Sequence, residues 1–280
     1  MSSDIITSSQ RTNLSVENEG AVIRTWSQGN GPLLILIPGG GGTGEGFDKS
    51  MPSLSKYYTV VAYDRRGNGK STVEKPRILN PMESARDIVA IVKAMGRTKA
   101  FLFGTSSGGT FALQVAQSYP EYVDGVILHE VPIVSILPEE HIKRVDSGYD
   151  VFQTYLEGGA EAALRTFRAS VSGNQVEPAP PKVPMDPNAP PHRLEYFFKY
   201  EFVIFMVYTP NLGAVKANGV PVATVEGIGS KGMLHAVSSK VLSEILGCRH
   251  VVWSGAHAPF AENAELFGED LHKTILLLEI

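Results

Sequence analysis

The sequence lacks the features that mark disulfide-bonded, membrane-spanning and nucleic-acid-binding proteins. Its single cysteine, Cys248, excludes an internal disulfide, and one thiol without neighbours argues against a metal site. No apolar run approaches the ~20 residues that a membrane span requires. The net charge is −4, and there is no block of basic residues. We therefore expect neither a membrane nor a nucleic acid as a partner.

The amino-terminal stretch, residues 1–13, also lacks an apolar core, so we expect a frayed terminus on a cytoplasmic protein. The chain of 280 residues is 43% hydrophobic and 19% charged, as in an ordinary globular protein. Its length suits one large α/β domain or two small ones. We find no internal repeat and no linker that would separate independent domains.

Apolar runs that read as strands alternate with helical patterns along much of the chain. Residues 21–26 alternate in the manner of an antiparallel edge strand, whereas residues 33–37 form a continuous apolar run, typical of a central strand buried on both faces. Further elements follow in alternation: strands at 58–64, 100–103, 123–128, 220–225 and 250–253, and helices at 81–95, 110–118, 233–246 and 262–278. This order predicts an α/β fold with a mostly parallel sheet and helices on both faces.

The strand pattern stops over residues 134–218. This segment contains a helical stretch at 149–170, a proline-rich loop at 178–191 and a second helix at 193–207 that is crowded with aromatic residues. An insertion of this size between two strands predicts a helical cap. The predicted core then consists of residues 1–133 and 219–280.

The aromatic helix is apolar almost all round, so it must be buried on several sides. Packing of the cap onto the core accounts for most of its aromatic residues. Phe198, Tyr200 and Phe202 are the candidates for contact with a substrate, because in open α/β sheets ligands bind beyond the carboxyl ends of the strands, where this insertion must lie.

The segment 99–109, K-A-F-L-F-G-T-S-S-G-G, predicts a nucleophile elbow around Ser106. An apolar strand breaks into G-T-S-S-G and passes directly into helix-forming residues. The turn is sharp, so the positions two before and two after the serine, Gly104 and Gly108, must have no Cβ. Ser106 would then be exposed at the carboxyl end of a strand.

A serine hydroxyl needs a neighbouring base to take its proton, and the chain has seven histidines. His257 follows the last predicted strand and lies at the same sheet edge as Ser106. His129 is also at a strand end, but its neighbour Glu130 competes for that place. The others are expected in helices, loops or strand starts away from that edge: His141, His192, His235, His250 and His272.

The imidazole must in turn be oriented by a carboxylate. The usual position, the loop after strand 220–225, holds no aspartate, although Glu226 is present. Glu130, at the end of strand 123–128, is the alternative. The order Ser106, Glu130, His257 matches nucleophile, acid, base, so we predict Glu130 as the acid and keep Glu226 as the reserve.

Four glycines follow the strand at 33–37, in P-G-G-G-G-T-G. The loop matches neither the G-x-x-x-x-G-K-[ST] phosphate-binding motif nor the dinucleotide-binding spacing. We interpret it as a loop that directs main-chain N–H groups at a substrate oxygen.

These segments together resemble the α/β-hydrolase superfamily over nearly the whole chain. The motifs are P-G-G-G-G at 38–42, D-R-R-G-N-G-K-S at 64–71, G-T-S-S-G-G at 104–109 and G-A-H at 255–257. L-H-E-V-P at 128–132, with no aspartate at the later loop, is similar to a subgroup that includes the fungal zearalenone lactonases, whose triad is Ser, His and Glu.

The resemblance implies Ser106 as nucleophile, His257 as base and Glu130 as acid, with the amides of Gly40 and Ser107 as the oxyanion hole. It implies no cofactor and no metal. The lactonases place a tryptophan in the cap over the substrate, whereas Trp26 and Trp253 both fall outside the predicted cap. The resemblance therefore predicts the chemistry of the reaction, but it does not predict a macrolactone substrate.

The expected function is hydrolysis of a small carboxylic ester or lactone through an acyl-enzyme (EC 3.1.1), by a monomer or a homodimer. The same triad can also cleave a C–C bond beside a carbonyl or act in polyketide tailoring, and these alternatives stay open. A non-catalytic relative would be expected to have lost part of the triad. Epoxide hydrolases and haloalkane dehalogenases use aspartate where this chain has Ser106.

Overall fold

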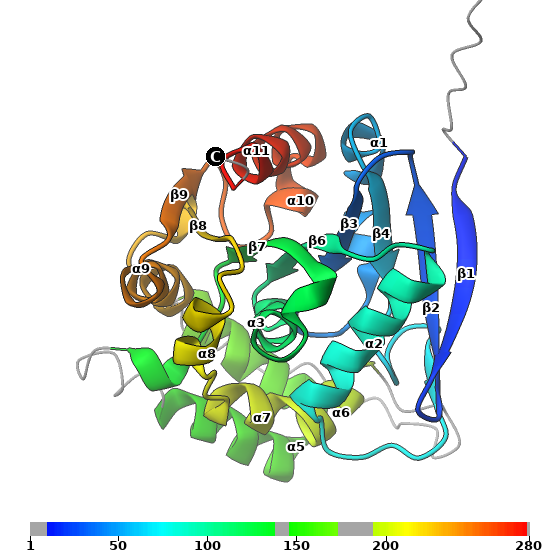
Figure 1. Ribbon diagram of the computed structural model, residues 1–280. Helices are drawn as coiled ribbons and strands as arrows, with labels where there is room; N and C mark the ends of the chain where they lie inside the picture. Colours follow the sequence, from blue (N-terminus) through cyan, green and yellow to red (C-terminus); the bar gives the residue numbers. More distant parts are fainter. Residues whose placement is uncertain (1–9, 138–145, 173–192, 279–280) are drawn as a thin grey trace, which may run out of the picture.

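The computed structural model describes residues 10–137, 146–172 and 193–278. In this part of the chain the strands form one nine-stranded sheet with helices on both faces (Figure 1). In chain order the strands are β1 (Thr12–Asn18), β2 (Ala21–Gln28), β3 (Leu33–Ile37), β4 (Thr59–Tyr63), β5 (Thr72–Val73), β6 (Ala100–Thr105), β7 (Val123–His129), β8 (Val222–Gly227) and β9 (Arg249–Trp253).

The described α-helices are α1 (Met51–Leu54), α2 (Pro81–Ala94), α3 (Gly108–Ser118), α5 (Asp146–Ser172), α6 (Arg193–Tyr196), α7 (Phe202–Val207), α8 (Leu212–Ala217), α9 (Leu234–Leu246), α10 (Pro259–Glu262) and α11 (Ala264–Leu276). Short 3₁₀ turns are η1 (Gly44–Phe47), η2 (Pro120–Tyr122), η3 (Val134–Ile136) and η5 (Ile228–Ser230), and η4 (Phe197–Glu201) is a π-helical turn.

The sheet order is β1-β2-β4-β3-β6-β7-β8-β9, with β5 paired to β2. All pairs from β4 to β9 are parallel, and the pairs made by β2 are antiparallel. The predicted fold class, a mostly parallel sheet covered by helices on both faces, is confirmed. Because β6, β7, β8 and β9 are consecutive neighbours, their carboxyl ends meet at one edge.

The central strand β3 shows why its sequence does not alternate. All of its residues are buried. Leu33, Ile35 and Ile37 pack in the apolar cluster that includes α2, α3 and α9, while Leu34 and Leu36 pack in the cluster that includes α1 and α11. A strand covered by helices on both faces must be apolar on both.

One expectation about the amino-terminal region is wrong. β2 is not an edge strand, because β1 pairs with it along its full length and β4 pairs on its other side. β1 begins at Thr12, inside the stretch expected to be frayed. It is polar and mostly exposed, so it carries no hydrophobic pattern, and its main-chain bonds to β2 hold it in the sheet.

The helices α5, α6, α7 and α8 all lie between β7 and β8 in the chain, and we call them the helical insertion. Figure 1 shows α5, α6 and α7 gathered together beyond the sheet. The aromatic helix predicted at 193–207 is present as α6, η4 and α7 in succession. As expected for a helix apolar almost all round, Phe197, Phe198, Phe202 and Phe205 are buried.

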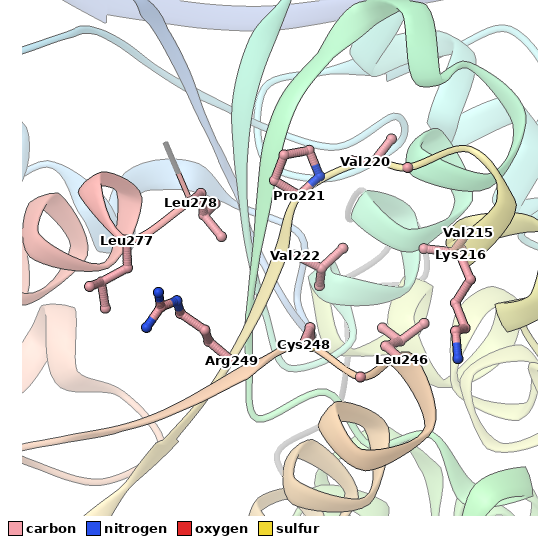
Figure 2. A pocket seen from close by; sticks show the side chains of 12 residues that line it. Val215, Lys216, Val220, Pro221, Val222, Leu246, Cys248, Arg249, Leu277 and Leu278 are labelled. Atoms are coloured by element: carbon pink, nitrogen blue, oxygen red, sulfur yellow. The ribbon is translucent and has the colours of Figure 1, made fainter. Parts of the chain in front are cut away.

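A groove of about 360 Å³ lies at the edge where β8 and β9 begin. Figure 2 shows its lining, which is mostly aliphatic and includes Leu277 and Leu278 from the chain after α11. Cys248 lines it as well, and burial raises the pKa of its thiol to about 11. The thiol is thus protonated at neutral pH, which makes it a weak nucleophile.

A buried ion pair ties the insertion to the core. The guanidinium of Arg65, in the loop after β4, donates to both carboxylate oxygens of Glu201 at 2.8 Å. Asn68 donates to the same carboxylate at 2.9 Å, and Arg65 also donates to the carbonyl of Gly39 at 3.2 Å. Glu201 is the last residue of the π-helical turn. Because Arg65 contacts both Glu201 and Gly39, it joins this turn to the glycine loop.

We expect Glu201→Ala to lower the free energy of unfolding by about 3–5 kcal/mol, because the substitution leaves the buried charge of Arg65 without its partner. Chemical denaturation of both proteins measures the difference. Glu269→Ala is the control: it breaks the exposed pair with Lys273 and should cost less than about 0.5 kcal/mol. Equal losses in the two variants would contradict this account.

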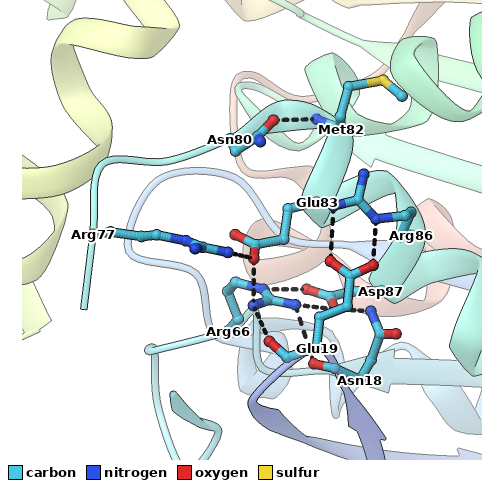
Figure 3. A network of polar contacts seen from close by, with 9 residues as sticks. All are labelled: Asn18, Glu19, Arg66, Arg77, Asn80, Met82, Glu83, Arg86 and Asp87. Carbon is cyan, nitrogen blue, oxygen red and sulfur yellow. Dashed lines mark hydrogen bonds and ion pairs between the residues drawn. The ribbon is translucent and has the colours of Figure 1, made fainter. Parts of the chain in front are cut away.

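A second arginine of the same loop, Arg66, fixes the loop to α2. Figure 3 shows its guanidinium between the carboxylates of Glu83 and Asp87. Asp87 also accepts from the side chain of Asn18 at the end of β1. These contacts hold the polar edge strand, the loop and α2 together.

Among the described residues, no helix is long and apolar enough to cross a membrane.

Candidate active site

Ser106 lies in the turn between β6 and α3, as its sequence context predicts. Its φ of +52° is in the left-handed region, which costs a non-glycine residue free energy and is often retained at functional sites. The turn is fixed on both sides: the N–H of Ser106 donates to the carbonyl of His129 at 2.8 Å, and the N–H of Gly109 donates to the carbonyl of Ser106 at 3.0 Å.

The glycines around Ser106 are required by close approach of backbone. A Cβ on Gly104 would lie 2.6 Å from the Cα of Gly109. A Cβ on Gly108 would collide with the carbonyl oxygen of Ile37. Real Cβ atoms do not approach backbone so closely, so α3 can start directly behind the strand only with glycine at both positions.

The glycine loop after β3 packs on the elbow. A Cβ on Gly39 would lie 2.9 Å from the carbonyl oxygen of Thr105 and 3.0 Å from the Cβ of Ser106. Gly40 follows it. In the described part of the chain neither the N–H of Gly40 nor that of Ser107 donates a hydrogen bond. Two unused main-chain donors therefore lie beside the serine.

Glu130 and His257 are in direct contact. The Oε2 atom of Glu130 lies 2.6 Å from Nδ1 of His257, and Oε1 accepts from the N–H of Gly227 at 2.8 Å. Glu130 follows β7 with a φ of +49°, unusual for glutamate, and its side chain is fully buried. The side chain of His257 is 35% exposed, which leaves its other nitrogen accessible.

His235 also belongs to this cluster, and the expectation that it lies away from the site is wrong. It is in the first turn of α9, and its Nε2 atom lies 3.3 Å from Oε2 of Glu130. The centroid of its ring is 4.3 Å from that of His257. The residue is 5% exposed, and Nε2 has no hydrogen-bond partner.

The charges in the cluster follow from burial and hydrogen bonding. Burial alone would raise the pKa of Glu130, but the hydrogen bond from His257, the two neighbouring histidines and the Gly227 amide lower it to about 2. Burial lowers the pKa of His129 to about 3 and that of His235 to about 4. At neutral pH Glu130 is therefore ionised and accepts the Nδ1 proton of His257.

The reserve acid, Glu226, has another neighbour. Its Oε2 atom lies 3.6 Å from Nε2 of His250, at the start of β9. His272 contacts the hydroxyl of Tyr58 at 2.8 Å. The other two histidines that were expected away from the site, His141 and His192, lie outside the described residues.

The structure records no hydrogen bond between Ser106 and His257 within the described ranges. The two residues flank the end of β7: His129 accepts from the Ser106 amide, and its ring centroid lies 6.2 Å from that of His257. Contacts between nucleophile and base are often loose without substrate. A serine on a strained turn, an imidazole paired with a carboxylate and two unused amides together can transfer an acyl group.

The aromatic residue that approaches this site is Phe197, which sequence reasoning missed. A Cβ on Gly40 would lie 3.3 Å from the ring of Phe197. Of the three candidates named from the sequence, Phe198 is fully buried between Tyr155 and Phe202, and the partly buried ring of Tyr200 packs on Tyr196. The position of Phe197 along the predicted helix does not distinguish it from these three residues.

Comparison with known proteins places these features in context. The model of a family described as alpha/beta hydrolase fold matches residues 32–175. The uncharacterized hydrolase YraK of Bacillus subtilis (strain 168) is 25% identical over 261 residues, covering 90% of this chain and 92% of its own.

Solved structures resemble the whole fold. One is that of Est816, described as an N-acyl homoserine lactone degrading enzyme, with a TM-score of 0.64, 20% identity and coverage of 93% of this chain and 99% of its own. Another is a thermophilic esterase from Thermogutta terrifontis, with a TM-score of 0.68, 17% identity and coverage of 97% and 100%. At these identities the likeness concerns the fold.

Proposed function

The chain belongs to the alpha/beta hydrolase fold family, and on that premise we propose that it is a serine hydrolase that cleaves a carboxylic ester or lactone through an acyl-enzyme. The observation that carries the proposal is the 2.6 Å contact between Glu130 and His257 at the sheet edge where Ser106 occupies a strained turn. Esterase and lactone-degrading structures with the same fold support the substrate class.

In the proposed mechanism Nε2 of His257 takes the proton of the Ser106 hydroxyl while its oxygen attacks the ester carbonyl. Glu130 keeps the proton on Nδ1 and stabilises the imidazolium that forms. The amides of Gly40 and Ser107 donate to the developing oxyanion. His257 then returns its proton to the leaving alcohol, and water releases the acyl group by the same steps.

Assignment of Glu130 as the acid extends the proposal to the subgroup with a Ser-His-Glu triad that resembles the fungal zearalenone lactonases. The support is that Glu130 contacts His257, whereas Glu226 lies beside His250. The three histidines near Glu130 also differ: His129 and His235 are buried and neutral, so His257 is the ring that can accept and return a proton.

A panel of p-nitrophenyl esters and lactones, including N-acyl homoserine lactones, tests the proposal, with Ser106→Ala protein as the control. We expect turnover of at least one class by the native protein. Absence of turnover across the panel, together with no labelling of Ser106 by a fluorophosphonate, would contradict it.

We also propose that the helical insertion acts as a cap that selects the substrate. Phe197 approaches the site, because its ring lies against Gly40. Phe198 and Phe202 pack on Phe197 from behind, with ring centroids 5.1 and 5.8 Å away. They and Tyr200 remain proposed substrate residues, acting in part through the position of Phe197.

Phe197→Ala should raise kcat/KM for large acyl esters relative to small ones by about tenfold or more, since removal of the ring opens space beside the oxyanion loop. The ratio is measured with p-nitrophenyl esters of increasing chain length. Phe198→Ala is the matched control: it should lower the melting temperature and change the ratio less. An unchanged ratio in Phe197→Ala would show that this ring serves only packing.

A further inference from the structure

His235 has no role in the proposed mechanism, yet it brings a third ligand atom to the Glu130–His257 pair. We propose that Glu130, His235 and His257 form a binding site for Zn²⁺, and that zinc bound there reversibly blocks the hydrolase. The inhibition rests on the proposed function, whereas binding of the metal does not.

The donor set suits zinc. One ligand atom from each of the three residues lies within 4.8 Å of the others. Two imidazoles and one carboxylate are a known zinc ligand set, which leaves a fourth position for water. Among the described residues, these three make up the group of histidine, cysteine and acidic side chains whose ligand atoms lie this close together.

The buried Nε2 atom of His235 is an independent observation that points to a ligand. It lies within a side chain that is 5% exposed, 3.3 Å from Oε2 of Glu130, and makes no hydrogen bond. A buried polar atom without a partner is costly, so something that binds it is favoured. The Gly227 amide occupies Oε1 of Glu130, so Oε2 is the atom directed at both histidines.

One of the ligand-atom distances already suits a metal, and a second needs a small change. Ligand atoms about 2.1 Å from a tetrahedral zinc ion lie about 3.4 Å apart. The distance from His235 to Glu130, 3.3 Å, already has this value. The distance from His257 to Glu130 is 2.6 Å and must lengthen by about 0.8 Å as zinc takes the lone pair of Nδ1 and the proton of the neutral ring moves to Nε2.

The consequence for the site is direct. With zinc on Nδ1, the ring proton of His257 is on Nε2, so this nitrogen cannot take the proton of Ser106. His257 is partly exposed while Glu130 and His235 are buried, so the ion reaches the site past the His257 ring. We therefore expect zinc and substrate to enter the site through the same opening.

The test is calorimetric titration of ZnCl₂ into native and Ser106→Ala proteins, which needs no turnover. We expect one ion per chain in both, and an affinity at least about tenfold lower in His235→Gln. His250→Gln is the matched control, because His250 also lies beside a glutamate, Glu226, but has no third ligand. It should bind zinc like the native protein.

Anomalous diffraction from zinc-soaked crystals of the native protein locates the ion without any variant. Density between Glu130, His235 and His257 supports the site. No binding, binding that His235→Gln leaves unchanged, or density elsewhere overturns it. Zinc binding without ester turnover would leave the site standing and refute the proposed function, and turnover without zinc binding would do the reverse.

Discussion

Ser106→Ala should lower kcat by roughly 10⁶-fold, with little change in KM and in the melting temperature. In the proposed mechanism the hydroxyl forms the covalent bond to the acyl group. The neighbouring residues Thr105 and Ser107 are buried, so we expect neither hydroxyl to take its place. Alanine removes one oxygen and leaves the turn intact, because the bonds from Ser106 N–H to His129 and from Gly109 N–H to Ser106 are made by main chain.

Stoichiometric labelling by a fluorophosphonate, read by mass spectrometry on the peptide that contains Ser106, measures the nucleophile directly. Ser254→Ala is the control, since Ser254 is an exposed serine just after β9 at the same edge of the sheet. It should keep full labelling. Labelling of another residue, or retained activity in folded Ser106→Ala, would refute the assignment.

Glu130→Gln should lower kcat by roughly 10⁴-fold while KM changes far less. The amide has the shape of the carboxylate, and one oxygen can still accept from Gly227, so the fold should survive. The amide cannot stabilise the imidazolium, and its NH₂ group favours the wrong tautomer of His257. The loss therefore falls on the chemical step.

Glu226→Gln is the matched comparison, because Glu226 lies near the carboxyl end of β8 and beside a histidine, His250. Its kcat should stay within a few-fold of the native value. If Glu226→Gln showed the large loss and Glu130→Gln the small one, the Ser-His-Glu assignment through Glu130 would fall, while the serine hydrolase proposal would stand.

Much of the fold follows from local sequence. The continuous apolar run of β3 requires helices on both faces, and G-T-S-S-G between an apolar strand and a helix requires a sharp turn. The helical pattern predicted at 81–95 is present as α2 (Pro81–Ala94). Signals of this kind extend over a few residues, so the sequence alone suffices to read them.

The failures have a common cause. β1 was missed because it is polar and is held in the sheet by main-chain bonds to β2, which leave no mark in its side chains. The sequence does not separate Phe197 from its aromatic neighbours, because the approach of its ring to Gly40 is a contact between the helical insertion and the core. The expectation for His235 is wrong because the sequence predicts its helix but not how that helix packs against the sheet.

Apart from β1 and β5, the sequence by itself determined the order of the strands along the chain. It also determined the elbow at Ser106 and the short list of histidines and carboxylates near strand ends. Only the tertiary structure decided which members of that list touch. Glu130 and His257 are 127 positions apart and meet at 2.6 Å because β7, β8 and β9 are neighbours in the sheet. His235 joins them because α9 begins beside the same edge, and no local pattern encodes a contact made by packing.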